Sequence, residues 1–267
     1  MILTAVRSCL LCLAFWAVTA GAQDAAETES SPSAVQTPEQ TITAKLNKIT
    51  GGAPLGDIRP SVIDGLYNVQ IIGGPAVMIT GDGQHVIMGD MYEVTDGGLA
   101  PIQDPYLLNA RKDFVASLKE GDTINFAPEG ETKHVAYVFT DVDCGYCRRL
   151  HTQMHSYRER GEKKPGYNDL GIEIRYLAFP RAGANSPSAA KLESAWCAKD
   201  PVAALDKLKN LEQVEPATCD SAPIEHQYVK GGELGVNATP TILLPDGRLF
   251  VGFQSPDRLL ESIEQGQ

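Results

Sequence analysis

The spacing of hydrophobic residues changes along the chain, and its first regular stretch is helical. Three apolar residues recur on one helical face: Ile42, Leu46 and Ile49. Thr37, with Pro38 after it and Gln40 three residues on, has the composition of a capped helix start. Gly51 follows as a helix stop. We therefore predict a helix over residues 37–50.

Between residues 60 and 99 the pattern changes to short β-rich runs. The runs are 66–72, 76–80, 84–88 and 91–95. Glycine-rich segments at 73–75 and 81–83 have the composition of turns between them. We predict one helix packed on a small antiparallel sheet over residues 37–101. This unit contains no cysteine and no cluster of metal-ligating residues, so we interpret it as a scaffold or association surface.

A second helix is predicted to begin at Asp104-Pro105 and to end at Gly121. Its apolar stripe consists of Leu107, Leu108, Phe114, Val115 and Leu118. About 16 residues of helix span about 24 Å, which is long enough for a linker between two domains. We assign residues 102–121 to this linker.

Strand and helix patterns alternate from residue 122 to the end. Strands are predicted at 134–140 and 172–179, with a hairpin at 241–252; helices are predicted at 144–160, 187–198, 224–234 and 256–264. A strand that leads directly into a helix is typical of α/β units. We predict such a unit over residues 122–267.

The first 22 residues have the pattern of a cleaved signal peptide. Arg7 precedes a short apolar run, and small residues end the segment at Ala20-Gly21-Ala22. The run is shorter than the ~20 residues that span a bilayer, which argues against a membrane anchor. We predict cleavage after Ala22, a flexible Ala/Ser/Glu/Pro-rich tail over 23–36, and export to an oxidising compartment.

Composition excludes one large class of function. The 267 residues carry 34 acidic and 23 basic side chains, a formal net charge of −11. Nucleic-acid binding needs clustered Lys and Arg to displace phosphate counterions. We therefore expect no nucleic-acid partner. Of the six cysteines, Cys9 and Cys12 leave with the signal peptide, so four remain to be assigned.

The chemistry is predicted at Cys144-Gly145-Tyr146-Cys147, which follows an apolar strand and opens a helix. A cysteine at a helix N-terminus meets unpaired backbone N–H groups and the positive end of the helix dipole, which stabilise a thiolate. This predicts Cys144 as the nucleophile and Cys147, one turn further and more buried, as the resolving thiol. Nearby basic and acidic side chains oppose each other: Arg148, Arg149, Asp141 and Asp143.

The CxxC segment has two alternative interpretations. It can supply half of a zinc site, completed by Cys197, Cys219 or His151, but the first two are 22 residues apart and lack paired ligand spacing. It can also be a purely structural bridge, although a four-residue loop constrains little of the unfolded chain. Redox chemistry is favoured, with no metal and no cofactor.

Three segments carry a family resemblance. Phe139–Cys147, with Leu150-His151, resembles the active-site segment of the bacterial DsbC/DsbG thiol:disulfide isomerases. Tyr176–Arg181 resembles the strand that follows their active-site helix, and Gly235–Thr241 resembles their cis-proline loop. The resemblance covers essentially the whole chain after the signal peptide. Gly-Tyr inside the CxxC is typical of DsbC rather than of DsbG.

The resemblance implies an α+β and α/β architecture. It implies a thioredoxin-like catalytic domain with inserted helices over 122–267, and a small cystatin-like N-terminal dimerisation domain over 37–101 joined to it by the helical linker. It also implies a homodimer with an apolar cleft, a periplasmic location, and a membrane thiol reductase of the DsbD type as the source of electrons. Thioredoxin has a buried Asp six residues before its first cysteine, where this chain has Val138. The proton acceptor for Cys147 is therefore not identified by the motif.

The resemblance also implies a cis bond at Thr239-Pro240, against a base rate of about 5–6% for X–Pro bonds. Such a bond turns the Thr239 backbone toward Cys144 and offers main-chain hydrogen bonds to an extended substrate. Gly145 and Tyr146 are expected to contact substrate as well. Thr239 and Pro240 complete this substrate-binding set.

The other two cysteines are Cys197 and Cys219, and in an oxidising compartment we expect them to form a structural disulfide. A second redox pair is the alternative, although separated cysteines without CxxC spacing seldom have depressed pKa values. His151 and His155 lie four residues apart without a matching carboxylate pattern, and we interpret them as surface residues near the site.

The predicted function is a thiol:disulfide isomerase and reductase that rearranges incorrect disulfides in misfolded exported proteins, with chaperone-like substrate binding. A dithiol oxidase that introduces disulfides is the alternative within enzymes. A holdase chaperone, in which the CxxC is incidental, is the alternative from another class.

Overall fold

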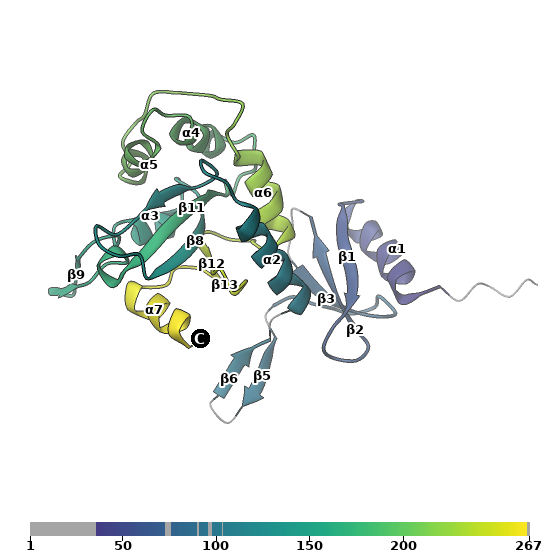
Figure 1. The fold of residues 1–267 in the computed structure, drawn as a ribbon. Coiled ribbons are helices and arrows are strands. Elements are labelled where there is room, and N and C mark those ends of the chain that lie inside the picture. Colours follow the sequence, from purple (N-terminus) through teal and green to yellow (C-terminus); the bar gives the residue numbers. More distant parts are fainter. Residues whose placement is uncertain (1–35, 73–75, 90, 96–97, 103, 266–267) are drawn as a thin grey trace, which may run out of the picture. The chain divides into compact units, whose positions relative to one another are not determined.

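The computed structural model describes residues 36–72, 76–89, 91–95, 98–102 and 104–265, and residues 36–267 group into one compact unit (Figure 1). The predicted signal peptide, residues 23–35 of the predicted tail and the predicted turn at 73–75 lie outside the described residues. In the described part of the chain, no helix has the length and apolar content needed to cross a membrane.

The predicted N-terminal helix is confirmed as α1 (Pro38–Thr50). Its capping box is complete, because Thr37 Oγ1 accepts from the Gln40 N–H and Gln40 Oε1 accepts from the Thr37 N–H. Gly51 ends the helix in the left-handed region, at φ +68°. The Ile42 and Leu46 side chains are buried in a small core with residues of the adjoining sheet: Val69, Val77 and Ile79.

The N-terminal sheet is antiparallel, as predicted, and its strand order is β1-β2-β3-β4. The strands are β1 (Leu55–Pro60), β2 (Leu66–Ile71), β3 (Ala76–Thr80) and β4 (Val86–Ile87). β1 was not predicted, because its sequence LGDIRP contains a glycine and a proline and shows no regular alternation. β5 (Tyr92–Thr95) pairs with β6 (Gly98–Pro101), which was also not predicted.

Helix α2 (Pro105–Ser117) begins at the predicted cap, where Asp104 accepts from the Tyr106 N–H. It ends four residues before Gly121, because Leu118 adopts an extended backbone. Phe114 on this helix packs on Phe139, with ring centroids 6.1 Å apart. Buried Arg111 donates from Nε to the Leu234 carbonyl at 2.9 Å. These contacts attach α2 to the C-terminal part of the chain.

The C-terminal sheet has the strand order β13-β12-β8-β11-β7. The strands are β7 (Ile124–Phe126), β8 (His134–Thr140), β11 (Ile172–Ala178), β12 (Thr241–Leu243) and β13 (Leu249–Val251). β8 and β11 are parallel, whereas β12 is antiparallel to β8. Alternate residues of β8 enter two cores: Ala136 and Val138 face one, and Tyr137 and Phe139 face the other. Burial on both faces explains the continuous apolar run in the sequence.

The remaining helices are α4 (Pro187–Trp196), α5 (Pro201–Lys209), α6 (Ile224–Glu233) and α7 (Pro256–Glu264). All but α5 were predicted. α5 carries a recognisable start signal, since Asp200 accepts from the Ala203 N–H and Pro201 opens the first turn. The same Asp-Pro pair identified α2.

The helix predicted over 144–160 is wrong in length, because α3 spans only Gly145–His151. Beyond it, the carbonyls of Gln153 and Met154 accept from the N–H groups of Tyr167 and Asn168. These long-range bonds take the chain out of the helix and into a hairpin of β9 (Tyr157–Glu159) and β10 (Glu162–Lys164). Leu150 and Met154 have the spacing of one helical face, which suggested a longer helix. Both are buried, although α3 ends at His151.

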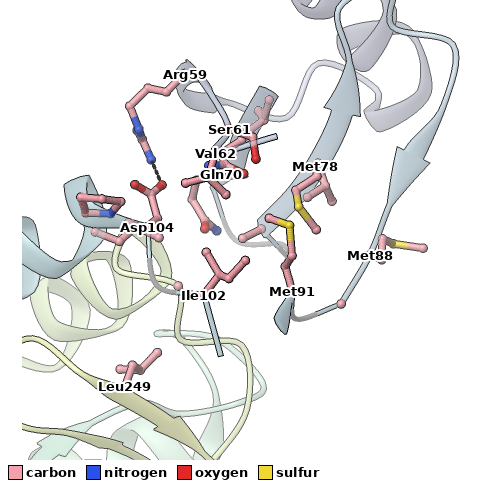
Figure 2. A pocket seen from close by; sticks show the side chains of 18 of the residues that line it. Arg59, Ser61, Val62, Gln70, Met78, Met88, Met91, Ile102, Asp104 and Leu249 are labelled. Atoms are coloured by element: carbon pink, nitrogen blue, oxygen red, sulfur yellow. Dashed lines mark hydrogen bonds and ion pairs between the residues drawn. The ribbon is translucent and has the colours of Figure 1, made fainter. Parts of the chain in front are cut away.

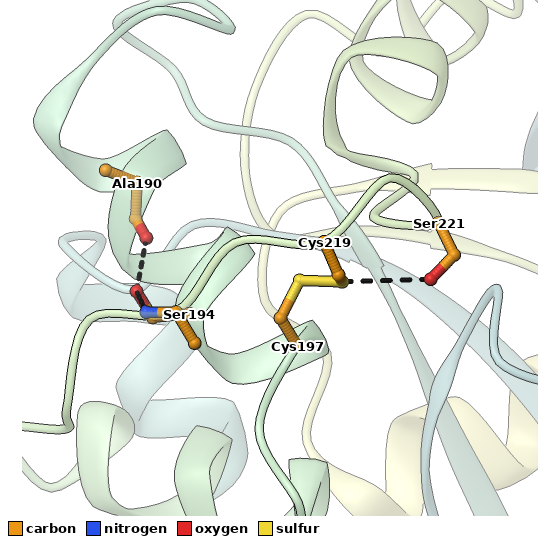
Figure 3. Close-up of a disulfide and its surroundings, with 6 residues drawn as sticks. Ala190, Ser194, Cys197, Cys219 and Ser221 are labelled. Atoms are coloured by element: carbon orange, nitrogen blue, oxygen red, sulfur yellow. Dashed lines mark hydrogen bonds between the residues drawn. A yellow bond between two sulfur atoms is a disulfide. The ribbon is translucent and has the colours of Figure 1, made fainter.

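A disulfide joins Cys197, at the end of α4, to Cys219 in the loop before α6, with their Cα atoms 5.7 Å apart (Figure 3). Nearby, Ser194 Oγ donates to the Ala190 carbonyl and accepts from the Ala217 N–H, which adds a second link between α4 and this loop.

Replacing both Cys197 and Cys219 by alanine should lower the free energy of unfolding by about 3 kcal/mol, because a bridge across 22 residues removes that much chain entropy from the unfolded state. Urea denaturation monitored by circular dichroism measures the change. In a Cys144→Ser/Cys147→Ser background, which removes the other cysteine pair, reductant should lower the midpoint of the protein that keeps Cys197 and Cys219 and leave that of the protein without them unchanged. Equal midpoints for the two oxidised proteins would contradict the prediction.

Candidate active site

The CxxC segment lies where β8 turns into α3 (Figure 1). Cys144 is the N-cap residue of α3, and its extended backbone aims Sγ at the first turn, where it accepts from the Cys147 N–H at 3.4 Å. Both cysteines are free thiols and both are buried, with 2% and 1% of their surface exposed. Tyr146 between them is 63% exposed, so the first turn of α3 faces solvent at this residue.

The cis-proline loop meets the CxxC from the other side. The Thr239-Pro240 bond is cis, and the Thr239 carbonyl accepts from the Cys144 thiol at 3.2 Å, across 95 residues of sequence. Pairing of β12 with β8 brings this loop to the site. Thr239 Oγ1 is buried and has no hydrogen-bond partner among the described residues. The cis-proline loop thus has one polar atom without a hydrogen-bond partner, Thr239 Oγ1, in the residue that contacts Cys144.

The two thiols have opposite pKa shifts. A hydrogen bond from the Cys147 thiol lowers the pKa of Cys144 to about 5, helped by the Cys147 N–H and the Arg181 guanidinium. Burial raises the pKa of Cys147, and its hydrogen bond to Cys144 adds to the rise. One sulfur is therefore a thiolate at neutral pH and the other is a thiol, although both are equally hidden from solvent.

The structure shows how the acidic and basic side chains around the CxxC are paired. Both nearby carboxylates are paired with cations. Asp141 accepts from the backbone N–H of Arg181 at 2.9 Å and from its Nε at 3.4 Å. Asp143 accepts from Lys191 Nζ at 2.7 Å. Arg148 donates instead to the Val142 carbonyl. Arg181 is a site residue that sequence reasoning did not single out, although it ends the segment Tyr176–Arg181 that carries the family resemblance.

His151 corrects one interpretation, since it is buried rather than on the surface. Its ring nitrogens contact the Tyr176 hydroxyl at 3.1 Å and Asp206 Oδ1 at 3.0 Å, and burial lowers its pKa. His155 is exposed, as expected. Within the described residues, no group of three His, Cys, Asp or Glu side chains is arranged to hold a metal ion.

Two cavities are lined in part by residues of the cis-proline loop. One, of about 710 Å³, is lined by Phe179, Tyr228, Val236 and Thr239, among others. The second, of about 530 Å³, is lined by apolar and methionine side chains that include Val62, Met78, Met88, Met91 and Ile102 (Figure 2). The Arg59–Asp104 ion pair, at 3.0 Å, lies at this cavity. Methionine-rich walls adapt to varied apolar partners.

The chain is similar to known families and relatives along most of its length. The family described as "Thioredoxin-like domain" matches residues 122–267, and "Disulfide bond isomerase protein N-terminal domain" matches residues 22–100. The thiol:disulfide interchange protein DsbC of Escherichia coli (strain K12) is 37% identical over 216 residues, which are 81% of this chain and 84% of that protein. The protein of the same name from Dickeya dadantii (strain 3937) is 36% identical over 227 residues, 85% of this chain and 87% of that protein.

Among solved structures, a disulfide interchange protein from Neisseria gonorrhoeae aligns with a TM-score of 0.45 and 25% identity, over 56% of this chain and 99% of that one. The two family matches together confirm the predicted combination of a thioredoxin-like domain with a second, N-terminal domain of the disulfide isomerase type.

The reactivity of Cys144 should persist far below the range of an ordinary cysteine. Its thiolate is the reactive form, so the rate of alkylation should stay level from pH 7.5 to about pH 6 and fall as pH drops through about 5. Iodoacetamide labelling of reduced Cys147→Ser protein, followed by mass spectrometry, measures the profile. Because Cys147 itself contributes to the low pKa, wild type is measured alongside. A midpoint near 8.5 in both proteins contradicts the assignment.

Proposed function

The chain belongs to the DsbC family of thiol:disulfide interchange proteins, and we propose that its reaction runs through Cys144 as nucleophile and Cys147 as resolving thiol. The observation that supports these roles is the opposed pair of pKa shifts at two equally buried sulfurs. Only the thiolate attacks a disulfide, so the sulfur with the lower pKa acts first.

Isomerisation follows from exchange at one sulfur. The Cys144 thiolate attacks an incorrect substrate disulfide, and the displaced substrate sulfur leaves with the electron pair. That sulfur then attacks another substrate cystine or the Cys144 adduct, so the bridge moves without net oxidation. When this stalls, Cys147 attacks Cys144, the substrate leaves reduced, and the enzyme is left as a disulfide. Thiol exchange is direct, so the reaction needs no bound cofactor.

We assign substrate contact to Gly145, Tyr146, Thr239 and Pro240. The exposed Tyr146 ring and the Thr239 backbone beside Cys144 support this assignment, since an extended chain can bond to an exposed backbone strand. The two apolar cavities support chaperone-like binding of misfolded exported proteins.

We further propose the surroundings in which the enzyme works. Residues 37–101 form a dimerisation domain, 102–121 a linker, and 122–267 the catalytic domain of a periplasmic homodimer. Exposed apolar side chains on the edge strand β4 and after it support an association surface there: Val86, Ile87 and Met88. A membrane thiol reductase of the DsbD type returns Cys144 and Cys147 to the dithiol state.

Recovery of activity from scrambled ribonuclease should require Cys144. Wild-type protein in a glutathione buffer should restore activity, and Cys144→Ser should reduce the rate to that of buffer alone, since the other free thiol of the described residues, Cys147, is buried and has a raised pKa. Cys147→Ser serves as the matched control, because it keeps the nucleophile and should accumulate mixed disulfides with ribonuclease.

Two outcomes would contradict this function. Equal recovery with wild type and Cys144→Ser indicates a holdase that acts through its cavities alone. Trapping of free thiols in cells with an alkylating reagent tests the other rival, because a dithiol oxidase would be found with Cys144 and Cys147 mostly oxidised.

A further inference from the structure

Lys209, the last residue of α5, is a buried cation that the reaction above does not use. Only 2% of its surface is exposed. Its Nζ donates to Thr140 Oγ1 at 2.5 Å and to the Asp141 carbonyl at 3.3 Å, and it lies 5.2 Å from the centroid of the Tyr176 ring. The ammonium therefore sits at the end of β8, directly beside the turn that leads into the CxxC.

This ammonium has no carboxylate partner among the described residues. The Asp141 side chain is bound by Arg181, and Asp206 on the same helix is bound by His151. Burying a cation without a counter-ion is costly, and burial lowers the pKa of Lys209 to about 8. The anions that favour its charged form are the thiolates of Cys147 and Cys144 together with Asp141.

Thr140 connects the two groups. Its hydroxyl accepts from Lys209 Nζ, which frees its own proton for a neighbouring acceptor. Hydrogen bonding from Thr140 and the charge of Lys209 both lower the pKa of the Cys147 thiol, against the larger effect of burial. Thr140 thus links the buried ammonium of Lys209 to Cys147.

We propose that Lys209 is a positioning residue for the resolving step, and that its ammonium acts through the Thr140 hydroxyl to stabilise the thiolate of Cys147. This rests on the proposed function, since it presupposes that Cys147 resolves a mixed disulfide. Where thioredoxin has a buried carboxyl group on the strand, this chain has Val138, and the charged group near Cys147 is instead a cation from α5, which stabilises the thiolate and does not accept its proton.

The step balances without any additional reactant. Cys147 gives up its proton to solvent, its sulfur attacks the Cys144 sulfur, and the bond from Cys144 to the substrate sulfur breaks. The substrate sulfur leaves with the electron pair and takes up a proton, so the substrate is reduced and the CxxC is oxidised. Lys209 stays an ammonium throughout.

The effect depends on pH in a defined direction. Lys209 is charged below about pH 8 and loses its charge above it, so its help to Cys147 is present at neutral pH and absent in alkali. The groups that face it are Cys144, Cys147, Arg148 and His151 from α3, Asp141 from the preceding turn, and Tyr176 from β11. Of these, Arg148 opposes its charge, and the thiolates and Asp141 favour it.

Stopped-flow reaction with 5,5′-dithiobis(2-nitrobenzoate) of the protein without residues 1–22, reduced at Cys144 and Cys147 with the Cys197–Cys219 disulfide intact, separates the two steps. The first release of the coloured thiolate reports attack by Cys144, and the second reports resolution by Cys147. Lys209→Met keeps the length of the side chain and removes its charge, and Thr140→Val keeps the shape and removes the hydroxyl. Lys207→Met, an exposed lysine on the same helix, is the matched control.

At pH 7 we expect the second phase to slow about tenfold in Lys209→Met and in Thr140→Val, and the double variant to be no slower than the slower single variant. The difference from wild type should close above pH 9, where Lys209 is neutral. Lys207→Met should match wild type throughout. Removing an unpaired buried charge should leave the fold intact, and Thr140→Val provides the same test if Lys209→Met does not fold.

Equal second-phase rates in Lys209→Met and Lys207→Met at pH 7, or a slowing in Lys209→Met that persists unchanged above pH 9, overturn the proposal. An unaltered second phase in Thr140→Val overturns the route through the hydroxyl. Failure of the proposed function looks different: the first phase is then missing in wild type, or the second phase survives in Cys147→Ser.

Discussion

The position of β8 in the C-terminal sheet is the constraint on which the active site depends. This strand pairs with β11 on one side and β12 on the other, and its side chains enter two cores. Its last residue, Thr140, is completely buried, so the turn that follows has little freedom. Cys144 is consequently delivered to the start of α3, and the neighbouring strand β12 delivers the cis-proline loop to the same sulfur.

The opposed pKa shifts of the two cysteines reflect hydrogen bonding rather than a difference in exposure. Both sulfurs are almost fully buried, and desolvation by itself raises the pKa of each. The pKa of Cys144 is nevertheless lowered, because its sulfur accepts hydrogen bonds. Cys147 is the donor in their shared bond and remains a thiol. An exchange enzyme needs this asymmetry, since one sulfur must attack at once and the other must wait.

The overall charge of the chain does not describe the charge around the CxxC. The protein is acidic, with a net charge of −11, yet its two nearest carboxylates are bound by Arg181 and Lys191 and a third cation, Lys209, is buried behind the site. Cations thus outnumber free carboxylates where thiolates form. Because the dielectric constant is low around the buried sulfurs, these few charges affect the thiolates more than the many charges on the surface do.

Local signals in the sequence were enough to predict most of the helix starts and the chemistry. Thr37, Asp104 and Ser186 cap helices through bonds to residues two or three positions away, and the apolar run of β8 leads directly into the CxxC. Asp200-Pro201 carried the same kind of signal and would have identified α5.

Only the tertiary structure decided the rest, because it depends on contacts between residues far apart in the chain. α3 ends where backbone groups of Gln153 and Met154 bind partners 14 residues on. Arg181 and Lys209 reach the site from other elements, across 40 and 69 residues. The sequence alone thus predicted the CxxC pair to which we assign the reaction, and the fold decided which charges surround it.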